Sequence, residues 1–417
     1  MKILIIGEGA REHAIAHKLA VSDLVTEIYV APGNGGTERI EKCMNIPKGD
    51  LCSLRDFALD NKIDYTVVGP EADLMEGIVD MFQEFNLKII GPHRKAALLE
   101  GSKAFAKDFM MKYGIKTAKY EVFEDFEKAK AYIRTSSYPL VIKADGLAAG
   151  KGVEIIDTYE DALVTLESFM LHEKFKDASK KIVIEEYLTG KEASIITLFD
   201  GNSIVSLNST MDHKKIGEGE TGLNTGGMGS LTPNPYFTKE LEADFKASIL
   251  DKTLEGIKRE GLSFKGIIFF GLMLTEKGTY LLEYNLRFGD PETQSLLETL
   301  QSDLNDLFLK VLDGTLKEED VTCSDDCALC VVLSAKDYPK SCEKDIDVTS
   351  FFQSENEKIK VFSYASMEEN GRILSCSGRV LSVVASGDKS ECFKNLYDFL
   401  DENRNVNLYY RNDIGRI

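Results

Sequence analysis

The first hundred residues alternate short apolar runs with longer amphipathic segments. The apolar runs cover residues 3–6, 28–30, 65–68 and 88–90, and helical patterns follow at 12–20 and 74–85. This alternation is typical of a doubly wound parallel sheet with helices on both faces. Each apolar run ends in a turn that contains glycine or proline, and open α/β sheets bind ligands at the carboxyl ends of their strands. The pattern predicts an N-terminal α/β domain over 1–103.

The rest of the chain breaks into smaller units. Its main strand patterns lie at 140–143, 152–156, 181–185, 266–274, 280–286, 329–335, 360–365 and 373–385. Polar stretches and helical patterns separate these strands. We therefore expect an α/β and α+β multidomain protein, with a small inserted domain over 121–192, a central domain made of 104–120 and 193–327, and a small C-terminal α/β domain over 328–417.

Polar and apolar residues alternate at the end of the strand pattern 280–286. Glu283, Asn285 and Arg287 occupy every second position and share one face, whereas Leu282 and Tyr284 point the other way, into a core. A carboxylate and an amide oxygen suit a hard cation such as Mg²⁺. A guanidinium beside them can grip a carboxylate or phosphate. An ordinary amphipathic strand with a solvated polar face explains the same pattern, so this strand alone leaves both interpretations open.

Charge and length exclude some partners. The chain has 417 residues and a formal net charge of −19, which argues against nucleic acid or an anionic membrane surface as a partner. No apolar run reaches the ~18 residues that span a bilayer. The apolar N-terminus stops at Gly7 without a small-residue cleavage site, so we expect a cytoplasmic protein. A phosphate-bearing ligand must then meet locally placed cations, backbone amides or a metal.

Three of the eight cysteines have the spacing of an iron–sulfur site, namely Cys323, Cys327 and Cys330. The alternative is that the first two lie in a polar linker and that Cys330 is a small buried residue of a strand. We favour this alternative because no companion cofactor motif is visible. The other cysteines are scattered, which fits reduced thiols in a cytosol.

A glycine-rich segment lies at 141–153 and reads VIKADGLAAGKGV. It differs from a P-loop, which needs four residues between its glycines, then Ser or Thr, then a helix. Strand patterns flank it on both sides, so we expect a β-hairpin whose tip folds over a ligand. Backbone amides of the tip can donate to phosphate oxygens, with Lys143 and Lys151 supplying charge. An ordinary flexible hairpin explains the glycines but not the two lysines.

Other signals are weaker. Segment 7–12 has two glycines of the dinucleotide fingerprint, but Glu12 replaces the third, so we expect a single phosphate there rather than NAD. The strand end at 184–192 carries carboxylates that suit a ribose. The glycine-rich stretch 217–235 is a long loop without a strand or helix pattern, and such loops are usually functional or disordered. His213 just before it is either a base or an ordinary histidine.

In this order, these segments resemble the ATP-grasp superfamily and, within it, the glycinamide ribonucleotide synthetase family. The resemblance spans nearly the whole chain and rests on the collinear segments 11–14, 31–34, 68–72, 99–105, 143–152, 212–214, 224–229, 285–294 and 410–415. It implies an ATP-grasp core in which the unit at 121–192 is a lid domain, between the N-terminal doubly wound parallel sheet and the small C-terminal domain.

The resemblance also implies an activity. Members of this family, the phosphoribosylamine–glycine ligases, use ATP to phosphorylate glycine. The amine of 5-phosphoribosylamine then attacks the glycyl phosphate, giving glycinamide ribonucleotide, ADP and phosphate in de novo purine synthesis. A carboxylate is a poor electrophile, so the site needs charge neutralisation for phosphoryl transfer more than a strong base. The implied cofactors are ATP and Mg²⁺ or Mn²⁺, and transient contact with the enzyme that makes the amine is a further expectation.

The resemblance assigns roles to residues of this sequence. The metal ligands are Glu283 and Asn285. The catalytic residues are Arg287, Asp290 and Asp212. The ATP-binding residues are Lys103, Lys143, Gly146, Gly150, Lys151, Gly152, Glu185, Glu186, Tyr187, Leu188 and Glu192. The residues for glycine and the ribosylamine are Gly9, Asn34, Glu71, Lys214, Asn224, Thr225, Gly226 and Gly289.

Two departures from the family pattern modify these expectations. Glu8 stands in the first turn where many members have an uncharged residue, so we expect that Glu8 points away or that this turn does not touch phosphate. The strand 266–274 carries no acidic metal ligand, so we expect two protein ligands per metal and more water. Two rival functions remain open: a carboxylate–amine ligase whose ADP release does not depend on glycine, and a nucleotide sensor that binds ATP without turnover.

Overall fold

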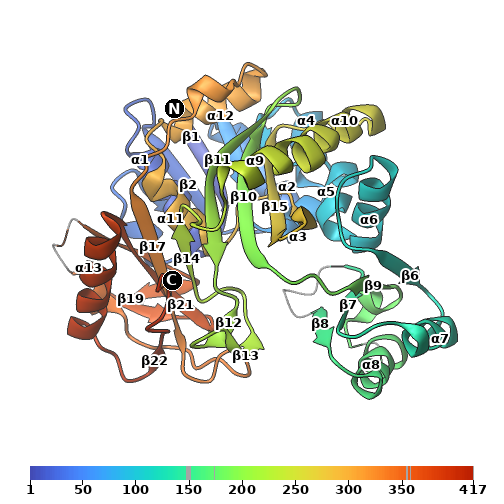
Figure 1. Ribbon diagram of the computed structural model, residues 1–417. Coiled ribbons are helices and arrows are strands. Elements are labelled where there is room, and N and C mark those ends of the chain that lie inside the picture. Colours follow the sequence, from blue (N-terminus) through green and yellow to red (C-terminus); the bar gives the residue numbers. More distant parts are fainter. Residues whose placement is uncertain (147–151, 173, 354–355, 357, 417) are drawn as a thin grey trace.

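The computed structural model describes residues 1–146, 152–172, 174–353, 356 and 358–416 (Figure 1). Most of the chain forms one body, and a smaller lobe made of β6 to β9 with α7 and α8 is set off from it. Within these residues, no helix combines the length and the apolar character that crossing a bilayer requires.

The N-terminal domain is a parallel sheet, as the sequence predicts. Its strand order is β3-β2-β1-β4-β5, with β1 Lys2–Gly7, β2 Glu27–Pro32, β3 Cys43–Asn45, β4 Tyr65–Val68 and β5 Ile89–Ile90. Ile3 and Ile5 pack in the core under α1 (Ala10–Ala20), whereas Leu4 and Ile6 pack against α2 (Leu51–Asp60), α3 (Glu71–Glu76) and α4 (Ile78–Glu84). The strand order reverses between β1 and β4, so the turns after these two strands border the crevice where such sheets bind ligands.

The inserted lobe is an antiparallel sheet in the order β6-β9-β7-β8. Its strands are β6 Tyr120–Phe123, β7 Leu140–Ala144, β8 Val153–Ile156 and β9 Ile182–Glu186. The helices α7 (Phe126–Thr135) and α8 (Tyr159–Leu166) pack on it through a core of their own, which includes Ile133, Ile142 and Leu166. A separate core is what a unit needs in order to move as a body.

The central and C-terminal strands form one continuous sheet in the order β16-β15-β10-β11-β14-β17-β21-β18, with β22 beside β17. Its strands are β10 Lys191–Phe199, β11 Ile204–Asp212, β14 Gly229–Thr232, β15 Gly266–Thr275, β16 Gly278–Asn285, β17 Cys327–Ala335, β18 Ile359–Ser363, β21 Arg379–Gly387 and β22 Leu408–Tyr409. β17 pairs with β14 on one side and with β21 on the other. The sheet therefore joins the C-terminal region to the central strands through hydrogen bonds.

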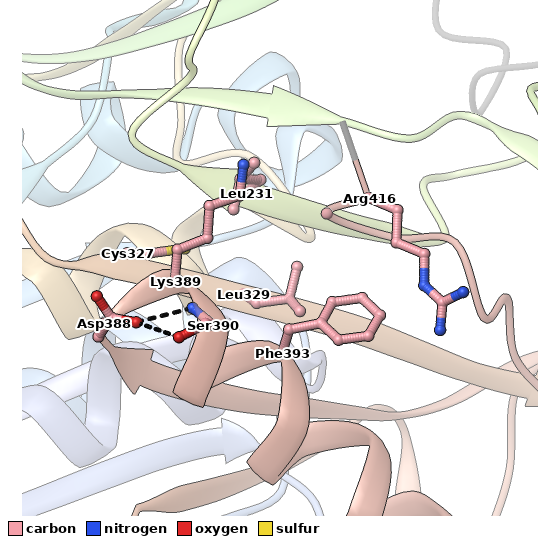
Figure 2. Close-up of a pocket in the computed structure, with 9 residues that line it drawn as sticks. Leu231, Cys327, Leu329, Asp388, Lys389, Ser390, Phe393 and Arg416 are labelled. Carbon is pink, nitrogen blue, oxygen red and sulfur yellow. Dashed lines mark hydrogen bonds between the residues drawn. The ribbon is translucent and has the colours of Figure 1, made fainter.

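Helices cover this sheet and connect it to the N-terminal domain. They are α5 Arg94–Gly101, α6 Lys103–Lys112, α9 Lys239–Phe245, α10 Asp251–Glu260, α11 Glu292–Thr299, α12 Leu304–Asp313 and α13 Lys389–Glu402. α11 and α12 contribute to the same core as α1. A pocket of about 880 Å³ opens between β14, β17 and the start of α13 (Figure 2).

The stretch 217–235 differs from the expectation of a long loop without strands. β12 (Lys215–Gly217) pairs with β13 (Thr221–Asn224), and β14 adds a strand to the main sheet. In the C-terminal region, β19 (Ser366–Glu369) pairs with β20 (Arg372–Ser375) as a separate hairpin. Glycines hide β12, β13 and β14 from the apolar pattern, but their backbone groups pair with neighbouring strands, and β14 is a buried interior strand of the main sheet.

Candidate active site

The two predicted metal ligands lie on β16, opposite β15. Glu283 pairs with Gly271 and Asn285 with Phe269, and the pairing is shifted by a bulge just before Glu283. The bulge changes which side chains face the core: Leu281 is buried in place of the expected Leu282, which is half-buried. Bulges commonly re-aim side chains beside functional sites. Beyond the bulge the alternation holds, so Glu283 and Asn285 share a face while Tyr284 is buried.

Arg287 follows β16 and lies among acidic groups from other elements. Its Nε is 3.2 Å from Oε1 of Glu100 in α5 and 3.6 Å from Oε2 of Glu71 in α3. Its Nη2 donates to Oδ1 of Asn285 at 3.3 Å. Burial raises the pKa of Glu100, although Arg287 opposes this effect. Arg287 therefore connects the predicted metal face to the crevice of the N-terminal domain.

Four cations lie close enough to the carboxylate of Glu283 to lower its pKa. They are Lys103 at the start of α6, Lys214 after β11, Lys143 in β7, and Arg287. Burial acts to raise the pKa of Glu283, but these cations hold it below its ordinary value. The carboxylate is thus ionised at neutral pH and available as an oxygen ligand. Positive groups gathered from four separate elements can neutralise a polyphosphate during transfer.

Glu185 pairs with two buried lysines between the inserted lobe and α6. Nζ of Lys143 is 2.8 Å from its Oε1, and Nζ of Lys107 is 3.1 Å from its Oε2. Lys107 also donates to Oγ1 of Thr117 at 2.7 Å. Burial lowers the pKa of Lys107 to about 8, although Glu185 opposes the shift. Against its own burial, the two lysines hold the pKa of Glu185 below its usual range. Two residues predicted to contact ATP therefore bind each other here.

The base of the glycine hairpin is attached to the start of α6. Oδ1 of Asp145 accepts hydrogen bonds from Oγ of Ser102 and the backbone N of Ala104, both at 3.0 Å. Gly146 and Gly152 flank the hairpin tip. Gly150 and Lys151, also predicted to bind ATP, lie outside the described residues.

The predicted adenine and ribose segment runs from the end of β9 into β10. The Glu186 backbone N donates to the carbonyl of Lys119, and its side chain accepts from the Lys119 N, both at 2.9 Å. Tyr187 is exposed and Leu188 half-buried. Nζ of Lys214 lies 2.7 Å from Oε2 of Glu192. The segment thus leads from the lid toward the cation cluster around Glu283.

Asp212 and Glu292 form an acidic pair, from the end of β11 and the start of α11. Burial, and then the charge of Glu292, raise the pKa of Asp212 well above its ordinary range, and burial also raises the pKa of Glu292. Across the described part of the chain, Oδ1 of Asp212 finds no hydrogen-bond partner. A Cβ added to Gly227 would lie 2.8 Å from this oxygen, and one added to Gly289 would lie 2.5 Å from Oε2 of Glu292. The two glycines therefore leave room for the carboxylates.

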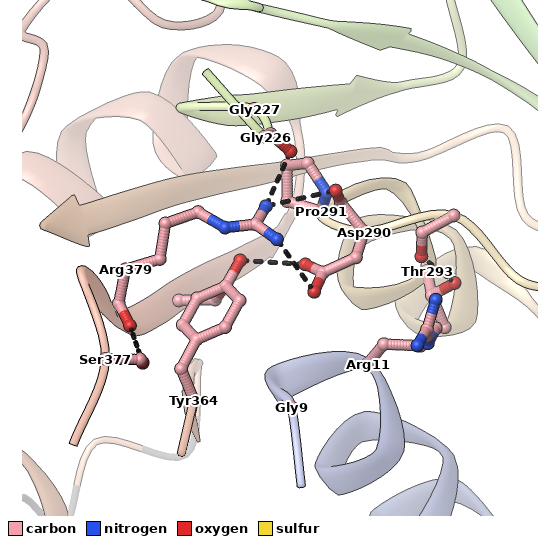
Figure 3. Close-up of polar contacts among 12 residues, drawn as sticks. Gly9, Arg11, Gly226, Gly227, Asp290, Pro291, Thr293, Tyr364, Ser377 and Arg379 are labelled. Carbon is pink, nitrogen blue, oxygen red and sulfur yellow. Dashed lines mark hydrogen bonds and ion pairs between the residues drawn. The ribbon is translucent and has the colours of Figure 1, made fainter. Parts of the chain in front are cut away.

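Asp290 is held by side chains from the C-terminal strands (Figure 3). Nη2 of Arg379 lies 3.3 Å from its Oδ2, and Tyr364 donates to its Oδ1 at 2.7 Å. Gln294 donates to the same oxygen at 2.9 Å. Arg379 also donates to the carbonyl of Gly226 at 2.6 Å. Arg379 and nearby Arg11 hold the pKa of Asp290 low against its burial.

The first glycine turn is filled by a side chain of the protein itself. Oε2 of Glu12 accepts a hydrogen bond from the backbone N of Gly9 at 2.7 Å. Oε1 of Glu12 lies so close to Gly69 that a Cβ added to this glycine would be 1.8 Å from it. The position that departs from the dinucleotide fingerprint thus places a carboxylate inside the turn. Glu8 is exposed, and Asn34 donates to the carbonyls of Glu8 and Ser363 while its Oδ1 accepts from backbone amides.

The segment 224–226 connects the acidic pair to the C-terminal region. Oγ1 of Thr225 donates to the carbonyl of Lys214 at 2.8 Å, and the Gly226 N donates to the hydroxyl of Tyr338 at 3.0 Å. Asn224 is exposed and pairs with Lys215 in the β12–β13 hairpin. The segment therefore borders the same region as Asp212 and Asp290.

Several residues of this site were missed by sequence reasoning. Glu100 and Glu292 lie within the segments that carry the family resemblance, so a signal for them was present. Lys107 follows Lys103 by one helical turn on α6, a spacing that places both on one face. Arg379 in β21 and Tyr364 just after β18 had no signal, since only the tertiary fold brings this part of the chain to Asp290.

The cysteine geometry supports the non-metal interpretation of the cysteine spacing. Cys327 and Cys330 are three residues apart on β17, so their side chains point to opposite faces. Cys330 is buried in the core that includes α1, whereas Cys327 packs at the edge of the C-terminal core. The two sulfurs therefore do not face one cluster.

Comparisons with known proteins agree with this geometry. Family models of phosphoribosylglycinamide synthetase match the chain in three parts: the N domain at residues 1–100, the ATP-grasp (A) domain at 101–293 and the C domain at 328–417. The phosphoribosylamine–glycine ligase of Clostridium acetobutylicum is 48% identical over 417 residues, 100% of both chains. That of Fusobacterium nucleatum is 47% identical over 420 residues, 100% of this chain and 99% of its own.

A solved structure extends the match to three dimensions. The crystal structure of phosphoribosylamine–glycine ligase from Thermotoga maritima superposes with a TM-score of 0.86 at 34% identity, covering 99% of this chain and 100% of that one. The expected family resemblance and the multidomain ATP-grasp fold are thus confirmed. The chain belongs to the phosphoribosylglycinamide synthetase family of ATP-grasp ligases.

Proposed function

We propose that this protein uses ATP to ligate glycine to 5-phosphoribosylamine, giving glycinamide ribonucleotide, ADP and phosphate. The observation that carries the proposal is the convergence of Lys103, Lys143, Lys214 and Arg287 on Glu283. Such a cluster suits phosphoryl transfer, where positioning and charge neutralisation matter most. Full-length membership of the ligase family supports the choice of substrates.

Glu283 and Asn285 fit the ligand set of a divalent cation. The carboxylate is ionised, and the Asn285 amide oxygen has a second lone pair beyond the one that accepts from Arg287. Mg²⁺ prefers such oxygen ligands, and Mn²⁺ takes the same type. When bound, the metal would neutralise charge on the ATP phosphates. The protein's own contribution is to hold these two oxygens on one strand face.

Binding of ATP would exchange partners in the lid. Lys143 is paired with Glu185 in the structure, and a phosphate oxygen would replace that carboxylate. Lys103 lies at the start of α6, beside the attachment of the hairpin through Asp145. Backbone groups from Glu186 to Leu188 would then hold adenine, with Glu192 accepting from the ribose.

The acidic pair would receive the ammonium group of glycine. Among the described residues Oδ1 of Asp212 has no hydrogen-bond partner, and burial raises the pKa of both Asp212 and Glu292. An ammonium group placed between the two carboxyl groups would favour their ionised form. Lys214 and Arg287 would hold the glycine carboxylate. One carboxylate oxygen attacks the γ-phosphorus and ADP leaves. The amine nitrogen then attacks the carbonyl carbon, phosphate leaves, and the nitrogen loses a proton.

The phosphoribosyl group would occupy the crevice at the ends of β1 and β4. Gly9 and Glu71 border that crevice, and a Cβ added to Gly9 would lie 3.8 Å from Oδ2 of Asp290. Asn34 would act by shaping the turn, since its amide atoms already bind backbone groups. Delivery of the amine by direct contact with the enzyme that makes it, and a cytoplasmic location, stay predictions.

An assay with phosphoribosylamine generated in situ tests the proposal. ADP formation should require both glycine and the amine, and Glu292→Gln should raise KM for glycine roughly tenfold while changing KM for ATP less than about threefold. Glu298→Gln, from the opposite end of α11, is a matched control and should leave both constants near wild type. ADP release without glycine would indicate another ligase, and ATP binding without turnover would indicate a sensor.

A further inference from the structure

Two cysteines lie close together where β17 packs on α13, and one of them, Cys327, lines the pocket (Figure 2). Cys327 begins β17, and Cys392 lies in the first turn of α13, 65 residues later. The Cys392 thiol donates to the carbonyl of Ala385 at 2.9 Å, and its Sγ also lies 3.5 Å from the carbonyl oxygen of Cys327. Both side chains belong to the C-terminal core, Cys392 as a buried member and Cys327 packed against it. Neither cysteine has a role in the proposed ligase site.

Only one of the two sulfurs is open to small molecules. Cys327 lines the pocket of about 880 Å³ together with Leu329 and Phe393, whereas Cys392 is fully buried. Lys389, at the first position of α13, also lines this pocket. A reagent in the pocket therefore reaches Cys327 first, because Cys392 is buried and does not line the pocket.

The local charges favour different roles for the two sulfurs. The neighbouring Cys392 thiol lowers the pKa of Cys327 against its partial burial, and the positive charge of Lys389 acts in the same direction. The neighbouring Cys327, together with burial, raises the pKa of Cys392. Thiolates are the nucleophiles of cysteine chemistry, so Cys327 is the attacking sulfur and Cys392 the resolving one.

We propose that Cys327 and Cys392 form a peroxide-reactive dithiol that closes into an intramolecular disulfide. The Cys327 thiolate attacks one oxygen of hydrogen peroxide, the O–O bond breaks, and hydroxide leaves to become water. The product is a sulfenic acid at Cys327. The Cys392 sulfur then attacks the Cys327 sulfur, loses its proton, and displaces the hydroxyl as a second water. Two thiols are oxidised by two electrons, and one peroxide is reduced to two waters.

The disulfide would connect the start of β17 to the first turn of α13. β17 lies beside β14, whose preceding segment 224–229 borders the acidic pair. The disulfide would hold α13 against the sheet and would change the lining of the pocket at Cys327. The two cysteines lie outside the proposed ligase site, so oxidation of this pair can be tested independently of the proposed function.

The test treats the full-length protein with hydrogen peroxide and maps its thiols. Two of the eight thiols should be lost, the mass should fall by two hydrogens, and a non-reduced digest should contain one peptide pair joined through Cys327 and Cys392. A dithiol reductant should reverse both changes. A joined pair that involves any other cysteine, or Cys327 oxidised to sulfinic acid with Cys392 still free, would overturn the proposal.

Variants separate the two roles. Cys392→Ser should stop at a sulfenic acid on Cys327 that a dione reagent traps, and Cys327→Ser should slow thiol loss roughly tenfold. Cys342→Ser, at an exposed cysteine elsewhere in the C-terminal region, is the matched control and should form the joined pair at the wild-type rate. Equal thiol loss in Cys327→Ser and wild type would contradict the assignment of Cys327 as the attacking sulfur.

Discussion

Arg379 and Asp290 form an ion pair, with Nη2 of the arginine 3.3 Å from Oδ2 of the aspartate, that joins β21 to the segment between β16 and α11. Tyr364 and Gln294 complete the contacts of the same carboxylate. Asp290 is therefore oriented by two residues of the C-terminal region and one of α11 before any substrate arrives. The C-terminal region contributes to the site by positioning a residue of the ATP-grasp domain.

Arg379→Ala should destabilise the protein because it leaves Asp290 mostly buried without its cation. Removal of one partner of a buried ion pair typically costs about 3 kcal/mol in free energy of unfolding, and urea denaturation measures it. Lys394→Ala, which removes an exposed partner of Asp398, is the control and should show no measurable change. Similar midpoints for both variants would show that the Arg379 contact contributes little.

Lys107→Met should weaken ATP binding, because Glu185 would lose one of its two cations and hold Lys143 more tightly. We expect KM for ATP to rise roughly tenfold. Lys112→Met, at an exposed position of the same helix, should behave as wild type. The pKa of Lys107 is about 8, so its charge is present below that pH and is lost above it. The difference in KM for ATP between Lys107→Met and wild type should therefore become smaller from pH 7 to pH 9. A difference that stays constant over this range would argue against a role of the Lys107 charge.

Glu283→Gln should raise the Mg²⁺ concentration that gives half-maximal ADP formation by about tenfold or more, because an amide is a weaker ligand than a carboxylate. Titration of Mg²⁺ at saturating ATP and glycine measures this shift. Glu276→Gln is the control, because it makes the same charge change in the exposed turn between β15 and β16, away from the site. It should leave the Mg²⁺ dependence as in wild type. An unchanged rate at limiting Mg²⁺ would disprove the metal assignment.

Acidification should destabilise the protein through His13. Its Nδ1 accepts from the backbone N of Ser363 at 3.0 Å, and burial lowers its pKa to about 3. An unfolded histidine titrates near pH ~6.5, so the unfolded state binds the proton first. The stability from neutral His13 is present above pH ~6.5 and is lost as the pH falls toward 3, which amounts to about 2 kcal/mol between pH 7 and pH 5.

Urea denaturation at pH 7 and pH 5 checks this contribution. His13→Asn retains an acceptor for the Ser363 amide but cannot titrate, so its loss of stability over this range should be about 2 kcal/mol smaller than that of wild type. His172→Asn, at an exposed position, should keep the wild-type pH dependence. An identical pH dependence in wild type and His13→Asn would refute the assignment.

The sequence determined the features that depend on local periodicity. Alternating apolar runs and helical patterns specify the parallel N-terminal sheet, because a strand repeats every two residues and a helix about every 3.6. The same rule placed Glu283 and Asn285 on one face of β16. Glycine and lysine spacing in 141–153 indicated a hairpin between strands, and β7 and β8 are those strands.

Only the tertiary structure decided which distant groups meet. The bulge before Glu283 moved Leu281 into the core in place of Leu282, and no local pattern encodes such an insertion. The pairing of Asp290 with Arg379, and of Cys327 with Cys392, joins residues far apart in the chain. Such contacts arise from packing of whole elements, whose relative positions depend on the shared core and on sheet order. Periodicity therefore specified the helices and strands, and packing determined which of their side chains meet.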